Sequence, residues 1–179
     1  MSDVARRPAR TMTVGELEGL LVQTALTTAC LCALACLVGS HLLWNWTPSL
    51  PLGLYWVSSR RETGVGALVA FPVPAGVRAL VRERRYLPPG AVLVKPVVAA
   101  AADDVCTDGG TLRVNGAPLG AVATEDTYGR PLPHDARCGP LPDGVVFVAS
   151  HLPTSFDSRT FGPVPISQIR GTVIPLWTY

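Results

Sequence analysis

Residues 91–98 of this 179-residue chain read AVLVKPVV, an apolar stretch that carries one lysine, Lys95. A short apolar run of this kind, directly after Pro88-Pro89-Gly90, is typical of a strand buried in a sheet. Similar runs bounded by glycine and proline recur along the chain: Leu54–Val57, Ala67–Phe71, Leu112–Val114, Val145–Ala149 and Thr172–Leu176. The sequence therefore predicts a mainly β domain.

Proline usage divides the chain into two parts. All prolines except Pro8 lie at Pro48 or later. Because proline interrupts helices, we expect residues 47–179 to form strands and turns. Asn115-Gly116 predicts a hairpin turn. Residues 75–87, AGVRALVRERRYL, predict one short helix that ends at Pro88-Pro89-Gly90, because their apolar side chains share a helical face.

An uncharged segment precedes the β domain. No Asp, Glu, Lys or Arg occurs between Glu18 and Arg60, and residues 20–43 are mostly apolar. About 20 such residues in a helix cross the ~30 Å core of a bilayer. Thr13 and Glu16 fit a capping box at the start of a helix. We therefore expect a transmembrane anchor helix over residues 14–46, with its terminal tryptophans at the membrane–water boundary.

Three arginines, Arg6, Arg7 and Arg10, precede the apolar segment. By the positive-inside rule, residues 1–13 form a cytoplasmic tail and residues 47–179 lie on the opposite side of the membrane. A cleaved signal peptide is the alternative, because Ala33-Leu34-Ala35 has the pattern of a cleavage site. The apolar run is longer than the roughly 7–15 residues of a signal core, which favours a retained anchor.

Composition and charge exclude two classes of protein. Hydrophobic residues make up 48% of the chain, which is enough to form a core and excludes a disordered protein. The formal net charge is only +2, so nothing indicates a nucleic-acid partner.

The five cysteines fall into two groups. Cys30, Cys32 and Cys36 lie in the apolar segment with no histidine or carboxylate between them, so we interpret them as small hydrophobic residues and expect no metal site. Cys106 and Cys138 lie in the β domain and can pair as a disulfide if that side of the membrane is oxidising. Thiol catalysis, with His134 near Cys138 in sequence, is the alternative.

Lys95 is the only lysine among 15 basic residues. In a strand it shares a face with Leu93 and Val97, and burial of this kind lowers the pKa of a lysine by up to ~3–5 units. A neutral amine can accept the proton of a serine hydroxyl, whereas an arginine stays charged. The alternative is a lysine at a strand edge with its ammonium group in water.

Two further segments carry hydroxyl groups. Residues 47–55 read TPSLPLGLY, in which the prolines restrict the backbone on both sides of Ser49. A proline-rich stalk between anchor and domain is the alternative interpretation. Residues 155–164 read SFDSRTFGPV. Here Asp157 and Arg159 would lie on one side of an extended strand and could pair, unless the segment is an ordinary polar turn.

Taken in order, these segments resemble the conserved boxes of the type I signal peptidases, the S26 serine peptidases, and most closely their conjugal-transfer branch, the TraF-type peptidases. The box Ser-x-Pro-x-Gly-x-Tyr is matched by Ser49, Pro51, Gly53 and Tyr55, and Lys95 occupies the general-base position. Residues 66–71 resemble a strand box of the family, and residues 82–90 resemble a segment of the conjugal branch. Residues 112–116 resemble the family's hairpin, and residues 155–162 resemble its last box.

The resemblance implies a signal-peptidase-like antiparallel β-sheet domain with one N-terminal transmembrane helix and a short inserted helix. It implies that Ser49 is the nucleophile and that Lys95 is the base. The hydroxyl of Thr47 and the backbone N–H of Ser49 would stabilise the oxyanion, and Ser155 would orient the Lys95 amine.

The same resemblance implies that Asp157 and Arg159 pair and brace the last loop. It further implies an endopeptidase of the bacterial inner membrane that needs no cofactor. Its substrate would be a membrane-inserted precursor, a conjugative pilin subunit, cleaved on the periplasmic side. A general signal peptidase that removes secretory signal peptides is one alternative, and a non-catalytic membrane-anchored scaffold of a conjugation or secretion apparatus is another. Hydrolysis or cyclisation of the acyl-enzyme stays open.

Overall fold

The computed structural model describes residues 13–179. It divides into two compact units, residues 1–41 and residues 42–179, which are described separately. The predicted cytoplasmic tail, with its arginines, lies outside the described residues except for Thr13.

The first unit contains one long helix, α1 (Val14–Gly39). Its predicted capping box is confirmed: the backbone N–H of Thr13 donates to Glu16 (2.8 Å), and the backbone N–H of Glu16 donates to Thr13 Oγ1 (3.3 Å). The helix is long and apolar enough to cross a membrane. The prediction that it continues to Trp46 was wrong, because the chain leaves the helix after Gly39 and its next residues pair as a strand.

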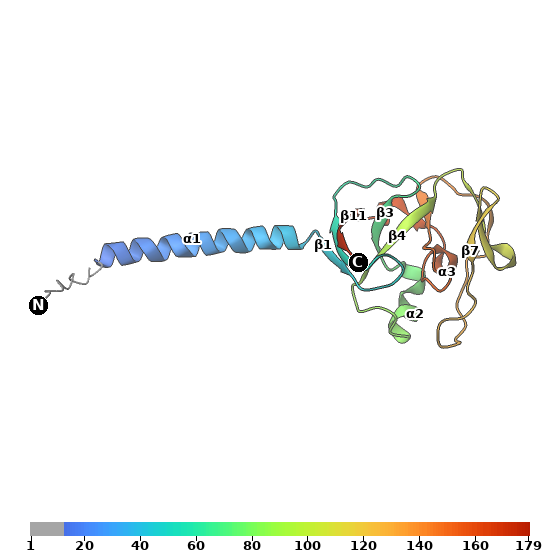
Figure 1. The fold of residues 1–179 in the computed structure, drawn as a ribbon, viewed down its shortest axis with the longest axis horizontal. Coiled ribbons are helices and arrows are strands. Elements are labelled where there is room, and N and C mark those ends of the chain that lie inside the picture. Colours follow the sequence, from blue (N-terminus) through green and yellow to red (C-terminus); the bar gives the residue numbers. More distant parts are fainter. Residues whose placement is uncertain (1–12) are drawn as a thin grey trace, which may run out of the picture. The chain divides into compact units, whose positions relative to one another are not determined.

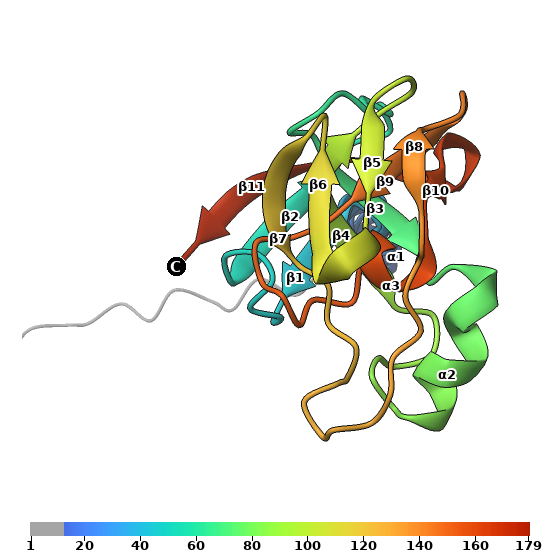
Figure 2. The ribbon, with the colours of Figure 1, turned by 90° about the vertical axis from the view of Figure 1, so that its right-hand side faces the viewer.

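The second unit is built from two antiparallel sheets, which confirms the predicted fold class (Figure 1). The larger sheet has seven strands, in the order β1 (Leu42–Asn45), β2 (Gly53–Val57), β11 (Gly171–Thr178), β3 (Leu68–Pro72), β4 (Val92–Ala99), β9 (Val145–Val148) and β10 (Val164–Pro165). The smaller has four, in the order β7 (Ala117–Ala121), β6 (Thr111–Val114), β5 (Asp104–Cys106) and β8 (Cys138–Pro140). Figure 2 shows the smaller sheet in front of the larger one.

Short helices occupy the connections. The predicted inserted helix is present as η1 (Ala75–Val77) followed by α2 (Arg78–Glu83), and it projects away from both sheets (Figures 1 and 2). It ends at Glu83, earlier than Pro88, because Arg85 takes a left-handed conformation with φ 54°. Three other short helices lie in loops: η2 (Asp108–Gly110), α3 (Ser158–Phe161) and η3 (Ile166–Gln168).

Strands β4 and β9 connect the two main parts of the core. One face of β4 contributes Leu93 and Val97 to a cluster within the large sheet, while Ala99 near its end joins a second cluster. On β9, Phe147 likewise belongs to the second cluster, which also contains Leu112 of the small sheet. Lys95 therefore sits on a strand that is held by apolar packing along its length.

One glycine of the serine box is required by the sheet. Gly53 begins β2 with φ 142°, a conformation that side-chain-bearing residues rarely adopt. A Cβ atom there would collide with the backbone carbonyl of Trp177 on β11. The close approach of these strands therefore explains the glycine that follows the serine loop.

The disulfide between Cys106 and Cys138 joins β5 to β8, as predicted, and so leaves neither thiol free for catalysis. Its partners are 32 residues apart. For a loop of this size, chain entropy in the unfolded state gives a stabilisation of roughly 3–4 kcal/mol.

We expect the double variant Cys106→Ser and Cys138→Ser to lose about this free energy of unfolding, because the unfolded chain regains its freedom. Thermal unfolding of the full chain in detergent measures the loss. Cys36→Ser, which removes a free cysteine of α1, is the control and leaves the unfolding of the β unit unchanged. An unaltered melting temperature in the double variant would contradict the predicted contribution.

Candidate active site

Three segments that are distant in sequence meet at the Lys95 amine. Lys95 Nζ donates to Ser49 Oγ at 2.7 Å and to Ser155 Oγ at 2.9 Å. Strand β4 positions the lysine, and Val69 lies opposite it in the antiparallel register with β3. The side chain is buried, with 5% of the residue exposed, and Ser49 is 6% exposed. The structure therefore brings together Ser49, Lys95 and Ser155, and their catalytic roles stay predictions.

Burial changes the protonation of this amine. Desolvation is the largest influence and lowers the pKa of Lys95 from 10.5 to about 8. The negative charge of Asp157 acts to raise this pKa, and the positive charge of Arg159 acts to lower it further. A useful fraction of the amine is therefore neutral near physiological pH, where an exposed lysine is almost entirely protonated.

Asn45 holds the loop that carries Ser49. Its side-chain amide donates to the backbone carbonyls of Thr47 (3.0 Å), Leu50 (3.2 Å) and Pro51 (3.1 Å), and its Oδ1 accepts from the backbone N–H of Thr47. Sequence reasoning missed this residue. The available signal was a polar residue between Trp44 and Trp46, immediately before the serine box.

The Tyr55 hydroxyl closes the same loop from β2, where it donates to the carbonyl of Pro51 at 2.6 Å. Tyr55 is almost completely buried. The tyrosine of the serine box therefore stabilises the backbone of the loop through the Pro51 carbonyl, and its hydrogen bond is not to Ser49 itself.

Thr47 lies beside Ser49. Its Oγ1 is 3.3 Å from Ser49 Oγ and donates to Asn45 Oδ1 at 2.8 Å. The hydroxyl is therefore close enough to act on a group bound at Ser49, although its proton is directed at Asn45 here. Its role as an oxyanion donor stays a prediction.

Asp157 and Arg159 form a buried, two-pronged ion pair. Arg159 Nε lies 2.9 Å from Asp157 Oδ1, and Arg159 Nη2 lies 2.6 Å from Oδ2. The pairing was predicted, but the expected extended strand is absent. Instead, Asp157 caps the N-terminus of α3 and Arg159 lies in its first turn. The two side chains meet because Asp157 is the N-cap of this short helix and accepts a hydrogen bond from the backbone N–H of Arg159 in its first turn.

This ion pair also organises the loop before it. Arg159 donates to the carbonyls of Ser150 (3.2 Å) and Leu152 (2.6 Å), and Asp157 accepts from the backbone N–H of Ser150 (3.1 Å). The loop so held leads directly to Ser155. The pair therefore supports the second hydrogen-bond partner of Lys95 and makes no hydrogen bond with the amine itself.

A cavity of about 220 Å³ opens beside the two catalytic candidates. Its walls are mostly apolar and come from four parts of the chain: Thr47, Pro48, Ser49, Tyr86, Leu87, Leu93, Lys95, Leu152, Thr154, Ser155 and Phe156. Tyr86 and Leu87 follow α2 in the stretch from η1 to Gly90, residues 75–90, which we call the inserted segment. Sequence reasoning did not assign these two residues to the site.

Tyr86 is fixed in this wall by a distant loop. Its hydroxyl donates a hydrogen bond to Asp126, and the Arg130 guanidinium lies 5.4 Å from the centre of its ring. Burial acts to raise the pKa of Asp126, but the hydrogen bonds from Tyr86, Arg130 and Tyr128 outweigh it and hold the pKa below its usual range. The carboxylate is therefore a constant anchor for Tyr86.

Residues 17–177 match the family model described as signal peptidase, peptidase S26. The chain belongs to this family. A solved structure of a signal peptidase I from Enterococcus faecalis is 21% identical, covers 64% of this chain and 98% of its own, and has a TM-score of 0.39.

Curated relatives are conjugal transfer proteins. A plasmid transfer protein TraF of Escherichia coli is 38% identical over 146 residues, which cover 75% of this chain and 82% of the relative. A probable conjugal transfer protein TraF of Sinorhizobium fredii is also 38% identical, over 75% of this chain and 76% of its own length. A conjugal transfer protein TraF of Agrobacterium tumefaciens is 34% identical over 81% and 86%. This S26 chain thus resembles the TraF proteins over most of its length.

We expect Asn45→Ala to destabilise this family member by about 1–3 kcal/mol, because the substitution leaves buried backbone groups of the serine loop without partners. Chemical denaturation followed by tryptophan fluorescence measures the loss. Thr154→Ala, a change at an exposed position of the same cavity, is the control and shifts the midpoint little. Equal midpoints for Asn45→Ala and the native chain would contradict the role of Asn45.

Proposed function

We propose that this chain is a membrane-anchored serine endopeptidase that uses Ser49 and Lys95 as a catalytic dyad. The observation that supports this most strongly is the contact of 2.7 Å between Ser49 Oγ and the buried Lys95 amine. Two properties are needed for such a dyad, a short path for the proton and a base that is neutral at working pH. The distance provides the first, and the lowered pKa of Lys95 provides the second.

In the proposed reaction, Ser49 Oγ attacks the carbonyl carbon of the scissile peptide while its proton moves to Lys95 Nζ. The resulting oxyanion accepts hydrogen bonds from the backbone N–H of Ser49 and from the Thr47 hydroxyl, which turns away from Asn45. One good donor of this kind is worth about 3–4 kcal/mol. The lysine ammonium then protonates the leaving amine, and an ester of Ser49 remains.

Release of the acyl group needs a second nucleophile. Neutral Lys95 removes a proton from water, or from an amine if the product is cyclised, and the nucleophile attacks the ester carbonyl. The bond between the acyl carbon and Ser49 Oγ then breaks, and the Lys95 ammonium returns the proton to Ser49 Oγ. Ser155 holds the amine in one direction during both steps through its 2.9 Å contact. Asp157 and Arg159 act as positioning residues, because they hold the loop that leads to Ser155.

The proposed arrangement in the cell follows from α1. Residues 14–39 cross the inner membrane, residues 1–13 stay in the cytoplasm, and the unit from residue 42 onward works in the periplasm. This is supported by the length and apolar composition of the helix and by the arginines before it.

The proposed substrate is a membrane-inserted precursor of the pilin type. The names of the TraF relatives support a conjugative system over general secretion. The small, mostly apolar cavity beside Ser49 suits a small apolar side chain next to the scissile bond.

We expect Ser49→Ala and Lys95→Arg each to reduce cleavage of a membrane-inserted pilin precursor by roughly a thousandfold or more. The first variant lacks the nucleophile, and the second carries a cation that cannot accept a proton. Gel analysis of the precursor in reconstituted membranes measures the effect, with Arg113→Gln as the active control. Full processing by either dyad variant would rule out the dyad and favour the scaffold alternative.

The pH dependence follows from the same pKa. Below about pH 8, kcat/KM should fall by about tenfold per pH unit, because only the neutral Lys95 acts as a base. Above this pH the rate should reach a plateau. Initial rates on a peptide substrate at constant ionic strength measure the profile, and a rate that does not change between about pH 6 and about pH 8 would contradict the role of Lys95.

A further inference from the structure

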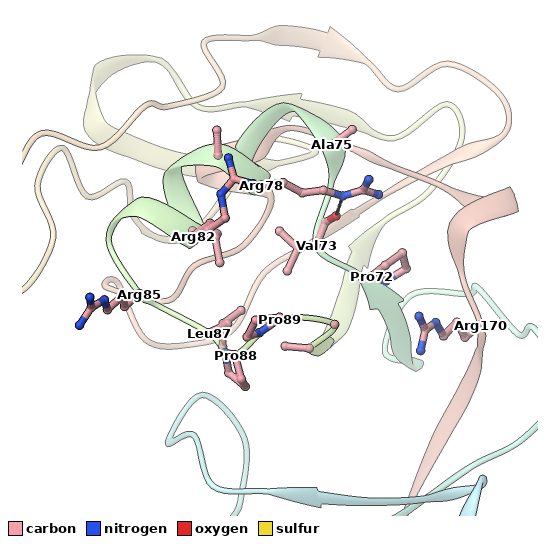
Figure 3. Close-up of a pocket in the computed structure, with 14 residues that line it drawn as sticks. Pro72, Val73, Ala75, Arg78, Arg82, Arg85, Leu87, Pro88, Pro89 and Arg170 are labelled. Carbon is pink, nitrogen blue, oxygen red and sulfur yellow. Dashed lines mark hydrogen bonds between the residues drawn. The ribbon is translucent and has the colours of Figure 1, made fainter.

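A second, larger groove lies next to the catalytic cavity and has no role in the proposed chemistry (Figure 3). Its volume is about 890 Å³. It is formed by the end of β3, by η1 and α2, by residues 85–91 and by Arg170 before β11. Leu87 lines both this groove and the catalytic cavity, so the two share a wall.

The groove combines an apolar centre with a basic edge. Figure 3 shows Val73, Leu87 and Pro89 between the guanidinium groups of Arg85 and Arg170, which lie on opposite sides. Arg78 and Arg82 line the groove as well. Arg78 is partly engaged, since its Nε donates to the backbone carbonyl of Val73 at 2.9 Å.

The positive charge of this groove is not neutralised by the protein. No Asp or Glu occurs among the residues that line it. Within residues 13–179, none of its four arginines takes part in a salt bridge. Arg84, between two of them in sequence, differs: it does not line the groove, and its Nη1 lies 3.6 Å from Asp126 Oδ2. Arg84 thus stabilises the structure of the inserted segment, whereas Arg78, Arg82 and Arg85 line the groove and can contact a bound ligand.

From this arrangement we infer that the groove binds an acidic, partly apolar segment of the substrate chain, on one side of the cleaved bond. This rests on the proposed endopeptidase function and specifies its substrate. Carboxylates of the segment would pair with the arginines at the edge, and its apolar side chains would pack on Val73, Leu87 and Pro89. The shared wall at Leu87 favours a substrate segment over a lipid, because a chain that leaves the catalytic cavity meets this groove next.

Binding can be tested without cleavage. The full chain carrying Ser49→Ala, in non-ionic detergent, is titrated into a short peptide of alanine, leucine and glutamate that bears an uncharged fluorophore, and anisotropy is recorded. The matched peptide has glutamine in place of glutamate. We expect the glutamate peptide to bind about tenfold more tightly, and we expect added salt to remove the difference, because the charges lie at an open edge.

Variants locate the interaction. Adding Arg82→Gln and Arg85→Gln together should weaken binding of the glutamate peptide by about three- to tenfold and leave the glutamine peptide unaffected. Both side chains are exposed, so the fold should persist. Arg113→Gln, an exposed arginine on β6 of the smaller sheet, is the matched control for loss of one charge and should change neither affinity.

Three outcomes would overturn the inference: equal affinity for the two peptides, an equal effect of Arg113→Gln and of the double variant at Arg82 and Arg85, or groove-dependent binding of mixed micelles of phosphatidylglycerol and detergent without binding of the glutamate peptide. The last result would assign the groove to an anionic lipid. A failure of the endopeptidase proposal looks different, since the native chain would then cleave no substrate while the peptide still bound Ser49→Ala.

Discussion

The burial of one amine in an apolar sheet is the constraint on which the site depends. Lys95 lies on β4, between residues that form the core, and water can no longer stabilise its charge. Within the described part of the chain, its hydrogen bonds go to two hydroxyl groups, those of Ser49 and Ser155. The same desolvation that costs folding free energy lowers the pKa of the amine, and in the proposed dyad this lowered pKa is what allows Lys95 to act as a base.

Much of the surrounding polar structure keeps those two hydroxyls in place. Asn45 satisfies the carbonyls of the serine loop, and the ion pair of Asp157 with Arg159 satisfies carbonyls of the loop that leads to Ser155. Each network is buried and closed by its own hydrogen bonds, which makes the positions of the serines hard to shift. The two loops are thus held by separate networks, and Lys95 donates a hydrogen bond to a serine of each.

In the proposed function, the inserted segment serves both catalysis and substrate binding. Tyr86 and Leu87 form part of the catalytic cavity, while the arginines around them line the neighbouring groove. Asp126 anchors Tyr86 from a loop forty residues further along the chain. Because one side of the segment is fixed by Asp126 and the other side is open, the segment can present charge to a substrate without losing the geometry of the cavity wall.

The amino-acid sequence determined the antiparallel β class, the start of α1 at its capping box, and the pairing of Ser49 with Lys95, because apolar runs, caps and boxes are local signals. It did not predict the end of α1 or the helical cap at Asp157, since both depend on partners elsewhere in the fold. Residues 42–45 pair with β2 as a strand. Arg159 lies in the first turn of α3 and donates to carbonyls of the preceding loop. Only the tertiary structure brought Asn45 and Tyr86 to the site, since hydrogen bonds between loops depend on where the sheets place them.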